Sequence, residues 1–365
     1  MQTKIKYLLV SFIFLLTSMS FVQSPSNKFV VVLDAGHGGK DPGNLGNGLK
    51  EKNIALNIVL NIGKELEKLD GIKVIYTRKS DKFIDLHERG AIANRADADL
   101  FVSVHCDAWT ESQVNGASTF VLGTKRSETN FDVAKRENEV IFLEENHEKN
   151  YEGFDPNNPE SLIGLMLMTE DYLDQSIQLA SYVQNNFTNQ LRRKNRGVKQ
   201  EGFIVLHQTY MPSVLIETGF LTNKKEGRYL SSNKGQMDMA MAIKEAIIKY
   251  KTSLNDSFDS SVLDEPTRDG VDTSSVYPEI AFKVQIAAGS RKLETKPYNF
   301  NGLNNITMDP IGNGYRYFYG ETSNYKEILK LKEVALKKGY SSSFIVAYKN
   351  GERIKMEDAL KRHSN

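Results

Sequence analysis

Apolar residues follow two different periods between residues 29 and 250, one typical of strands and one typical of helices. β-branched and leucine-rich runs predict buried strands at Phe29–Asp34, Lys73–Thr77, Leu100–His105, Ala117–Leu122 and Val214–Glu217. Apolar residues that recur every three or four positions predict helices at Asn53–Leu69, Leu86–Arg95, Leu173–Arg192 and Lys234–Lys249. Strands that alternate with helices predict an α/β fold with a mainly parallel sheet flanked by helices on both faces.

Two stretches depart from this alternation. Residues 125–170 are polar and acid-rich and then adopt loop composition, so we interpret them as a helical insertion in a core domain of residues 28–250. Residues 251–279 are rich in Ser, Asp and Thr, which predicts a flexible linker. Beyond the linker, a small α+β domain is predicted over residues 280–355, with strands and a helix at Phe282–Ala287, Tyr315–Tyr319, Tyr325–Lys338 and Phe344–Tyr348.

The composition limits the number of domains and the kinds of partner and cross-link, but it does not indicate a function. The length of 365 residues exceeds what one hydrophobic core usually supports, in agreement with two domains. The net charge of +1 gives no argument for nucleic acid, so no nucleic-acid partner is expected. The single cysteine excludes an intramolecular disulfide.

The first 24 residues have the pattern of an export signal. Lys4 and Lys6 precede the mostly apolar stretch Tyr7–Phe21, and small residues follow it. We therefore predict a signal peptide over residues 1–24 and secretion across the inner membrane, to a periplasmic or cell-wall location. An uncleaved N-terminal anchor is the alternative.

Two histidines follow strand-like runs. Glycines in LDAGHGGKDPG (Leu33–Gly43) allow a sharp turn after the first strand, and LFVSVH ends in His105. Open α/β sheets bind ligands at the carboxyl ends of their strands, and neighbouring strands lie about 5 Å apart. His37 and His105 are therefore predicted to converge on one metal ion. For His37, a glycine-rich turn that happens to expose a histidine is the alternative.

Two glutamates could complete such a site. Glu51 opens the helix after the first turn, where it is either a favourable charge at a helix N-terminus or a third metal ligand. Glu217 ends an apolar strand, where a carboxylate is costly unless it faces a cleft or a partner. We predict that Glu217 accepts a proton beside the metal, and a satisfied structural glutamate is the alternative.

A series of motifs in this order resembles N-acetylmuramoyl-L-alanine amidase family 3. The motifs are LDAGHGGKDPG, Glu51, Tyr76–Arg78, Leu86–Asn94, Ala98–Ala108 and Ile216–Asn223. The resemblance covers about residues 28–250. It departs from the family pattern at Cys106 and Asp107, which stand where small and Asn residues are usual.

The resemblance implies a zinc ion held by His37, Glu51 and His105, with Glu217 as the catalytic carboxylate. It implies that peptidoglycan is the substrate, cut at the amide between N-acetylmuramic acid and L-alanine in wall remodelling and daughter-cell separation. Two alternatives remain. One is a catalytically silent peptidoglycan-binding scaffold, and the other is a zinc carboxypeptidase-like enzyme with Arg78 or Arg89 in a carboxylate pocket.

The resemblance also implies a use for the insertion of residues 125–170. Some members of the family carry a helical insertion whose acidic side chain occupies the open metal position. The candidate residues for this autoinhibitory role are Glu137, Glu139, Glu144 and Glu145. A protein activator would then displace the insertion by binding at Ser161–Leu173, and a solvated acidic helix is the alternative.

The C-terminal region resembles a SPOR domain, a family that binds glycan strands stripped of stem peptides. The resemblance rests on FKVQIAAG, YRYFYG and SSSFIVAY. Sugar binding suits an aromatic sheet face, and Tyr315, Tyr317 and Tyr319 alternate onto one face of their strand. Ordinary packing within the sheet is the alternative for these tyrosines.

Overall fold

The computed structural model describes residues 28–123, 127–151, 154–158, 161, 172–262, 275–289, 292–311, 314–340 and 343–361. The predicted signal peptide and most of the predicted activator surface at Ser161–Leu173 lie outside these residues. Within them, no helix combines the length and apolar character needed to cross a membrane.

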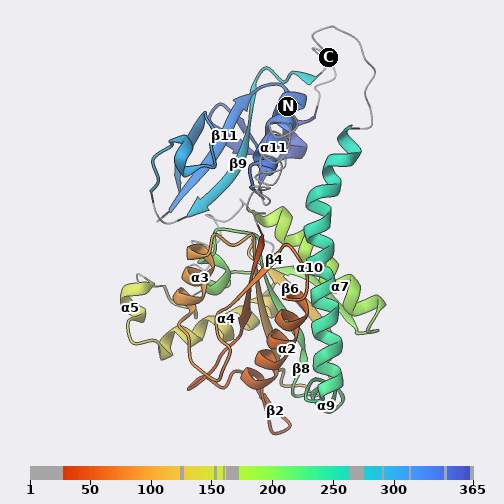
Figure 1. The fold of residues 1–365 in the computed structure, drawn as a ribbon. Helices are drawn as coiled ribbons and strands as arrows, with labels where there is room; N and C mark the ends of the chain where they lie inside the picture. Colours follow the sequence, from red (N-terminus) through yellow and green to blue (C-terminus); the bar gives the residue numbers. More distant parts are fainter. Residues whose placement is uncertain are drawn as a thin grey trace, which may run out of the picture.

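A six-stranded sheet forms the centre of the larger domain (Figure 1). Its strands, in spatial order, are β4 (Ile72–Tyr76), β1 (Phe29–Ala35), β5 (Leu100–Asp107), β8 (Ser213–Phe220), β6 (Ala117–Val121) and β7 (Asn195–Gln200). All neighbouring strands pair in parallel except β6 and β8. The prediction of a mainly parallel sheet is confirmed.

Helices cover both faces of this sheet, as predicted. One face packs against α2 (Glu51–Leu66), α7 (Leu173–Asn189) and α10 (Asn233–Val262). The other face packs against α3 (Leu86–Arg95) and α8 (Ile204–His207). Side-chain alternation along a strand divides the two cores: Leu33 belongs to the first and its neighbour Val32 to the second.

Several short elements were not predicted. They are β2 (Leu45–Gly46), β3 (Leu49–Lys50), α8 and α9 (Lys224–Leu230), together with the edge strand β7. The predicted linker of residues 251–279 is wrong at its start, because α10 continues to Val262. Extending an existing helix requires no new nucleus, so a polar segment can continue a helix that packing has already formed.

The insertion is helical in the part that the structure describes. Its elements are α4 (Glu128–Asn138), the 3-10 helix η1 (Glu139–Leu143) and α5 (His147–Asn150). Ser127 caps α4, because its hydroxyl accepts a hydrogen bond from Asn130 N. Val133, Ala134 and Ile141 are buried in the same core as α3 and α8, so this segment packs on the domain.

The C-terminal domain is a five-stranded antiparallel sheet with one long helix (Figure 1). Its strands, in spatial order, are β10 (Ile306–Ile311), β11 (Gly314–Thr322), β9 (Ile280–Gly289), β12 (Phe344–Lys349) and β13 (Glu352–Ile354). The helices and short turns are α11 (Tyr325–Lys337), η4 (Pro297–Asn299) and α12 (Met356–Ala359). This arrangement confirms the predicted small α+β domain.

Tyr315, Tyr317 and Tyr319 lie on the sheet face that forms the core of this domain. Tyr317 is 1% exposed, and the other two pack against the same core, which includes Ile328 of α11. Tyr317 is therefore not available to a glycan, and Tyr315 and Tyr319 are only partly exposed, because α11 packs on the face onto which these residues alternate.

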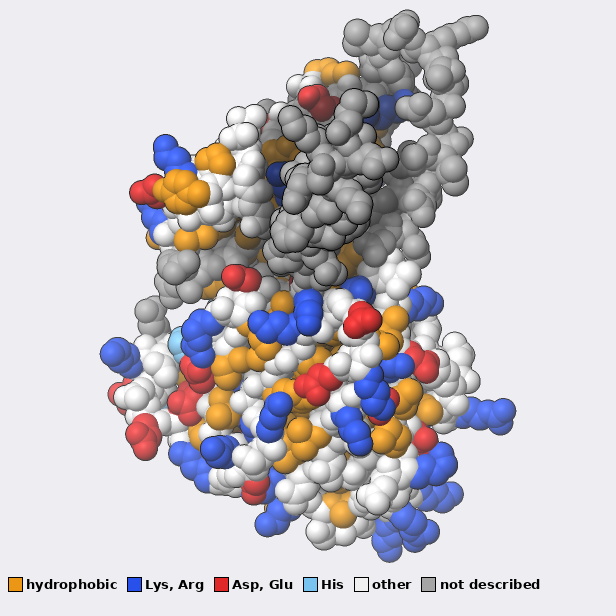
Figure 2. Space-filling model, in the orientation of Figure 1, with side chains coloured by type: hydrophobic (Ala, Val, Ile, Leu, Met, Phe, Trp, Pro, Cys, Tyr) orange, Lys and Arg blue, Asp and Glu red, His pale blue; other side chains and the backbone are white. Residues whose placement is uncertain are grey.

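The two domains contact each other where the insertion rejoins the core. Tyr172, just before α7, accepts a hydrogen bond from Gln285 Nε2 through its hydroxyl at 2.9 Å. Its ring lies edge-on to Phe344 of β12, with centroids 5.4 Å apart. On the face shown in Figure 2, basic and acidic side chains are interspersed over the larger domain.

Candidate active site

His37 lies in a tight turn at the carboxyl end of β1. The residue adopts a left-handed conformation (φ 61°), and Gly38 and Gly39 also have positive φ (129° and 56°). A Cβ atom at Gly36 would overlap the His105 imidazole, so the glycine allows the two metal-binding segments to approach. The glycines of this motif therefore position His37 against the end of β5.

Four side chains converge on one point at this edge of the sheet. His37, Glu51, His105 and Glu137 each offer one ligand atom, and these atoms all lie within 4.8 Å of one another. Glu51 Oε2 lies 3.1 Å from His37 Nε2, and Glu51 Oε1 lies 3.1 Å from His105 Nδ1. Backbone amides of Asn44 and Cys106 donate to the two oxygens of Glu51 and fix its orientation.

The donor set fits a zinc ion. Two imidazoles and a carboxylate are the ligands of many catalytic zinc sites, which keep a further position open. His37 Nε2 and Glu137 Oε2 are buried and lie 3.1 Å apart, but neither makes a hydrogen bond within the described part of the chain. Buried polar atoms without a hydrogen bond are costly, and a cation at the centre of the four side chains would satisfy both.

Carboxylates hold the two imidazoles in the charged state when no metal is bound. Burial opposes the charge on His105, but Glu137 and Glu51 outweigh it and raise the pKa of His105 to about 9. Burial likewise opposes ionisation of Glu51, yet His37 and His105 lower its pKa to about 2. The cluster therefore balances its charges internally in the absence of metal.

Each histidine is oriented by a partner on its other nitrogen. His37 Nδ1 lies 2.7 Å from Asp41 Oδ2, and His105 Nε2 lies 3.0 Å from Ser103 Oγ. Ser103 in turn donates to the buried carboxylate of Asp34. Such partners fix the tautomer and ring orientation of metal-binding histidines.

Glu217 is a buried acid next to this cluster. It is the register partner of His105 across β5 and β8, and neither of its carboxylate oxygens has a hydrogen-bond partner among the described residues. Burial and the nearby carboxylate of Asp107 raise the pKa of Glu217 well above its usual value. A side chain in this state can hold a proton and exchange it with a group at the metal.

The chain matches the sequence model of the N-acetylmuramoyl-L-alanine amidase family over residues 31–249. The match spans more than half of the chain and contains His37, Glu51, His105 and Glu217. The chain belongs to this amidase family. We refer below to residues 28–250 as the amidase domain.

Sequence similarity to two amidases agrees with this assignment. The chain is 35% identical to the N-acetylmuramoyl-L-alanine amidase AmiA of Escherichia coli K12, over 61% of the chain and 76% of AmiA. It is 34% identical to AmiC of Escherichia coli O6:H1, over 60% of the chain and 52% of AmiC. A solved structure of an amidase from Clostridium difficile 630 is 26% identical with a TM-score of 0.48, covering 62% of the chain and 98% of that structure.

Of the four acidic candidates in the insertion of the amidase domain, only Glu137 reaches the cluster. Its Oε2 lies 3.1 Å from both His37 Nε2 and His105 Nδ1. Burial opposes its ionisation, but the two histidines lower the pKa of Glu137 well below its usual value. The carboxylate therefore stands where a fourth ligand would bind.

The other three candidates lie elsewhere. Glu139 is partly exposed and pairs with Lys135 at 3.9 Å, and Glu145 is exposed. Glu144 is buried, but its carboxylate accepts hydrogen bonds from Leu86 N and Tyr151 Oη, so it fastens the insertion to α3. These contacts leave Glu137 as the candidate that the geometry favours.

Three other residues considered from the sequence, Cys106, Arg78 and Arg89, make structural contacts in the amidase domain. Cys106 Sγ lies 3.1 Å from Thr218 Oγ1, away from the cluster. Arg78 donates to the carbonyls of Ala35 and Gly36, and Arg89 Nη2 donates to the carbonyl of His37. Both guanidinium groups therefore hold the metal-binding turn, which weighs against a carboxylate-binding pocket built around them.

Three members of the site, Asp41, Ser103 and Arg136, were not predicted from the sequence. Asp41 follows His37 by four residues in the glycine-rich turn, and Ser103 precedes His105 by two residues on the same strand face. Those two spacings could have indicated the orienting partners. No local spacing indicated Arg136, because its partner Asp107 belongs to a distant strand.

Proposed function

We propose that this chain is a zinc-dependent enzyme that hydrolyses the amide bond between N-acetylmuramic acid and L-alanine in peptidoglycan. The observation that carries the proposal is the convergence of the ligand atoms of His37, Glu51 and His105 beside the buried acid Glu217. The carboxylate of Glu217 is buried and has no hydrogen-bond partner among the described residues, which costs folding free energy. A catalytically silent scaffold that only binds peptidoglycan would have no use for such a group.

His37, Glu51 and His105 would hold the zinc ion. When bound, zinc polarises the amide carbonyl and makes a water molecule acidic enough to attack at neutral pH. Glu217 accepts the proton of the attacking water and delivers it to the nitrogen of the departing L-alanine. Asp41 and Ser103 keep the two imidazoles in the orientation that this chemistry requires.

We further propose that the described structure is an inhibited form in which Glu137 takes the open ligand position. Its carboxylate lies 3.1 Å from both histidines, so substrate and water would compete with it for the metal. A protein activator that binds the insertion of residues 125–170 would withdraw α4 and expose the metal. The helical elements of the insertion pack on α3 and α8, so an activator would have to displace a packed cover.

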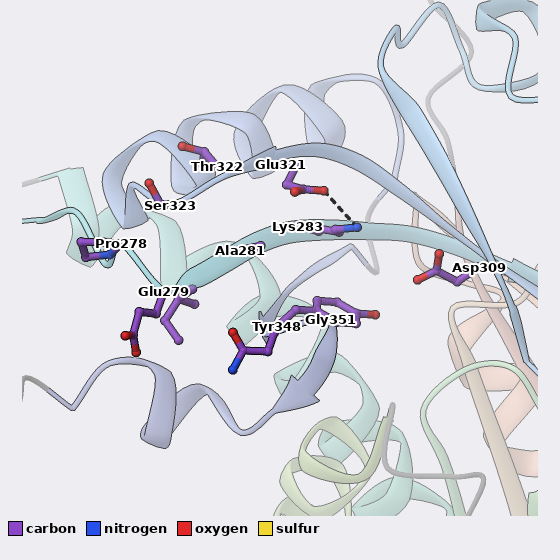
Figure 3. Close-up of a pocket in the computed structure, with 12 residues that line it drawn as sticks. Pro278, Glu279, Ala281, Lys283, Asp309, Glu321, Thr322, Ser323, Tyr348 and Gly351 are labelled. Atoms are coloured by element: carbon purple, nitrogen blue, oxygen red, sulfur yellow. Dashed lines mark ion pairs between the residues drawn. The ribbon is translucent and has the colours of Figure 1, made fainter.

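Residues 280–355 would form a SPOR-like domain that binds peptidoglycan glycan strands. Because Tyr317 is buried and Tyr315 and Tyr319 are only partly exposed, we assign binding to the sheet face opposite α11. Lys283 on this face lies over the rings of Phe318 and Tyr348, at 5.7 and 5.3 Å from their centroids. A hollow of about 540 Å³ lies beside them, and Lys283 pairs there with Glu321 at 3.0 Å (Figure 3). Phe318 is fully buried, so Tyr348, which lines the hollow beside the charged groups, offers the aromatic surface for a sugar.

A signal peptide over residues 1–24 would place the enzyme in the periplasm or at the cell wall. The N-terminal sequence pattern supports this location, and so does the substrate. Glycan binding by the C-terminal domain would raise the local concentration of substrate around the amidase domain. This arrangement would serve wall remodelling and the separation of daughter cells.

Digestion of purified peptidoglycan tests the proposed reaction. The zinc-loaded enzyme, carrying Glu137→Gln to open the site, should release fragments with free L-alanine amino termini. The same protein with Glu217→Ala should release none. New reducing sugar ends instead of amino termini would show that a glycosidic bond is cut and would overturn the proposal.

A further inference from the structure

Arg136 contacts the catalytic sheet directly beside the residue that blocks the metal site. Its Nη2 lies 2.8 Å from Asp107 Oδ1, at the end of β5 and two residues after His105. Its guanidinium carbon lies 5.6 Å from the centre of the Trp109 ring. Arg136 immediately precedes Glu137 in α4, so this contact and the Glu137 contact are made by consecutive residues.

The next residue anchors α4 at a second place. Asn138 Nδ2 donates to the carbonyl of Gly202 at 2.8 Å, and Asn138 Oδ1 accepts from Ile204 N at 2.9 Å. Glu137 is therefore bracketed by two anchors, one charged and one neutral. The neutral anchor binds a loop and helix α8, whereas the charged anchor binds the strand that carries a metal ligand.

The charge of Arg136 balances the buried carboxylate of Asp107. Asp107 is only 3% exposed, so little water reaches its carboxylate. A buried carboxylate needs a compensating cation, because removing one partner of such a pair leaves an unbalanced buried charge. Among the ion pairs of the described residues, Asp107 has Arg136 as its cationic partner. Withdrawal of α4 therefore carries an electrostatic cost at Asp107.

We infer that Arg136 is a positioning residue that clamps the inhibitory helix onto the catalytic sheet through Asp107 and Trp109. The inference rests on the proposed inhibition by Glu137. The clamp keeps Glu137 at the metal in the resting enzyme. A partner that activates the enzyme has to break the contact between Arg136 and Asp107, or replace it with one of its own.

Amide hydrogen exchange of the full-length, zinc-loaded protein tests the clamp. Arg136→Met keeps most of the length of the side chain and removes its charge. This variant should speed amide exchange in α4 (Glu128–Asn138) by about tenfold and leave exchange in the central sheet unchanged. It should also raise basal peptidoglycan hydrolysis by a similar factor. Arg136→Lys should restore part of the protection, because it keeps the charge but loses the planar fork.

Lys135→Met is the matched control, because Lys135 is the preceding residue and its described ion pair is a 3.9 Å contact with Glu139. It should change neither exchange nor hydrolysis. In an Asp107→Asn background, Arg136→Met should add little further exchange, because the partner is already neutral. A full tenfold increase in that background would mean that Arg136 acts through another group.

The outcomes separate the clamp from the inhibition. Unchanged exchange of α4 in Arg136→Met overturns the clamp, even if Glu137→Gln activates the enzyme. A second outcome is faster exchange of α4 in Arg136→Met with no rise in hydrolysis in either Arg136→Met or Glu137→Gln. This outcome supports the clamp and overturns the proposed inhibition. The single tryptophan gives a second signal, since the emission of Trp109 should shift in Asp107→Asn if α4 moves away.

Discussion

His105 and Glu217 are register partners on the neighbouring parallel strands β5 and β8. Paired residues on adjacent strands lie about 5 Å apart, and their side chains point to the same face of the sheet. A proposed metal ligand and a buried acid are thus held next to each other by the hydrogen bonds of the sheet. Strand pairing sets the distance between the metal and the group that we propose as its proton acceptor.

Replacing Glu217 by Gln should remove hydrolysis while leaving the metal site intact. The amide has nearly the same shape but cannot accept a proton, so we expect a loss of about 10²–10⁴-fold in kcat. Zinc content, measured by atomic absorption, should match that of the unmodified protein. A variant that keeps its activity would show that Glu217 has no part in proton transfer.

Ser103→Ala should weaken zinc binding without removing a ligand. The hydroxyl lies between His105 Nε2 and Asp34 Oδ2, so its loss releases the imidazole from its orienting partner. Loss of such an outer partner typically lowers metal affinity about 10–100-fold. Competition with a chelator measures the change. Ser118→Ala, at a buried serine on β6, is the control and should bind zinc like the unmodified protein.

Glu137→Gln should raise basal hydrolysis. The neutral amide is a much poorer zinc ligand than a carboxylate, so the inhibited form loses stability relative to the open form. We expect an increase of about tenfold or more, measured as free amino termini released from peptidoglycan. Glu139→Gln, two residues away and partly exposed, should have no effect. Equal rates for all three proteins would contradict inhibition by Glu137.

Arg89→Met should destabilise the amidase domain. Arg89 and Asp34 form a fully buried pair at 2.8 Å, and breaking such a pair costs about 3–5 kcal/mol. Burial opposes ionisation of Asp34, but Arg89 and the hydroxyls of Ser103 and Thr77 outweigh it and lower its pKa. The stabilisation is therefore present above the unfolded pKa of about 3.9 and is lost as the pH falls through the lower folded pKa.

Chemical unfolding at several pH values measures this effect. The difference in unfolding free energy between the two proteins should be largest near neutral pH and should shrink in acid. Arg95→Met, which makes the same substitution in the same helix, serves as the control, because Arg95 pairs with Glu88 at the surface. It should change stability by less than about 1 kcal/mol. An equal loss of stability in both variants would contradict a special role for the buried pair.

Local sequence was sufficient for the main elements and for most of the residues that meet in the candidate site. Apolar periodicity predicted the strands β1 and β5 and the helices α2 and α3, because burial on one or both faces leaves a repeat in the chain. The glycine-rich turn and the strand-end positions identified His37, His105, Glu51 and Glu217. These signals are local, since each depends on a few neighbouring residues.

The sequence did not predict contacts between segments that are distant along the chain. Nothing in the acidic run distinguished Glu137 from Glu144, because the choice depends on which face of α4 meets the end of β5. Alternation correctly placed the tyrosines of β11 on one side, but only the packing of α11 decided that this side is covered. The polar start of the predicted linker gave no sign that α10 would continue through it.

The sequence by itself determined the fold class, three residues of the candidate metal site and the acid beside them, because periodicity and turn chemistry are properties of short segments. Tertiary structure alone decided that Glu137 enters the site, that Asp41 and Ser103 orient the histidines, and that Arg136 pairs with Asp107. Those contacts join residues through packing and charge in three dimensions, and spacing along the chain does not encode them.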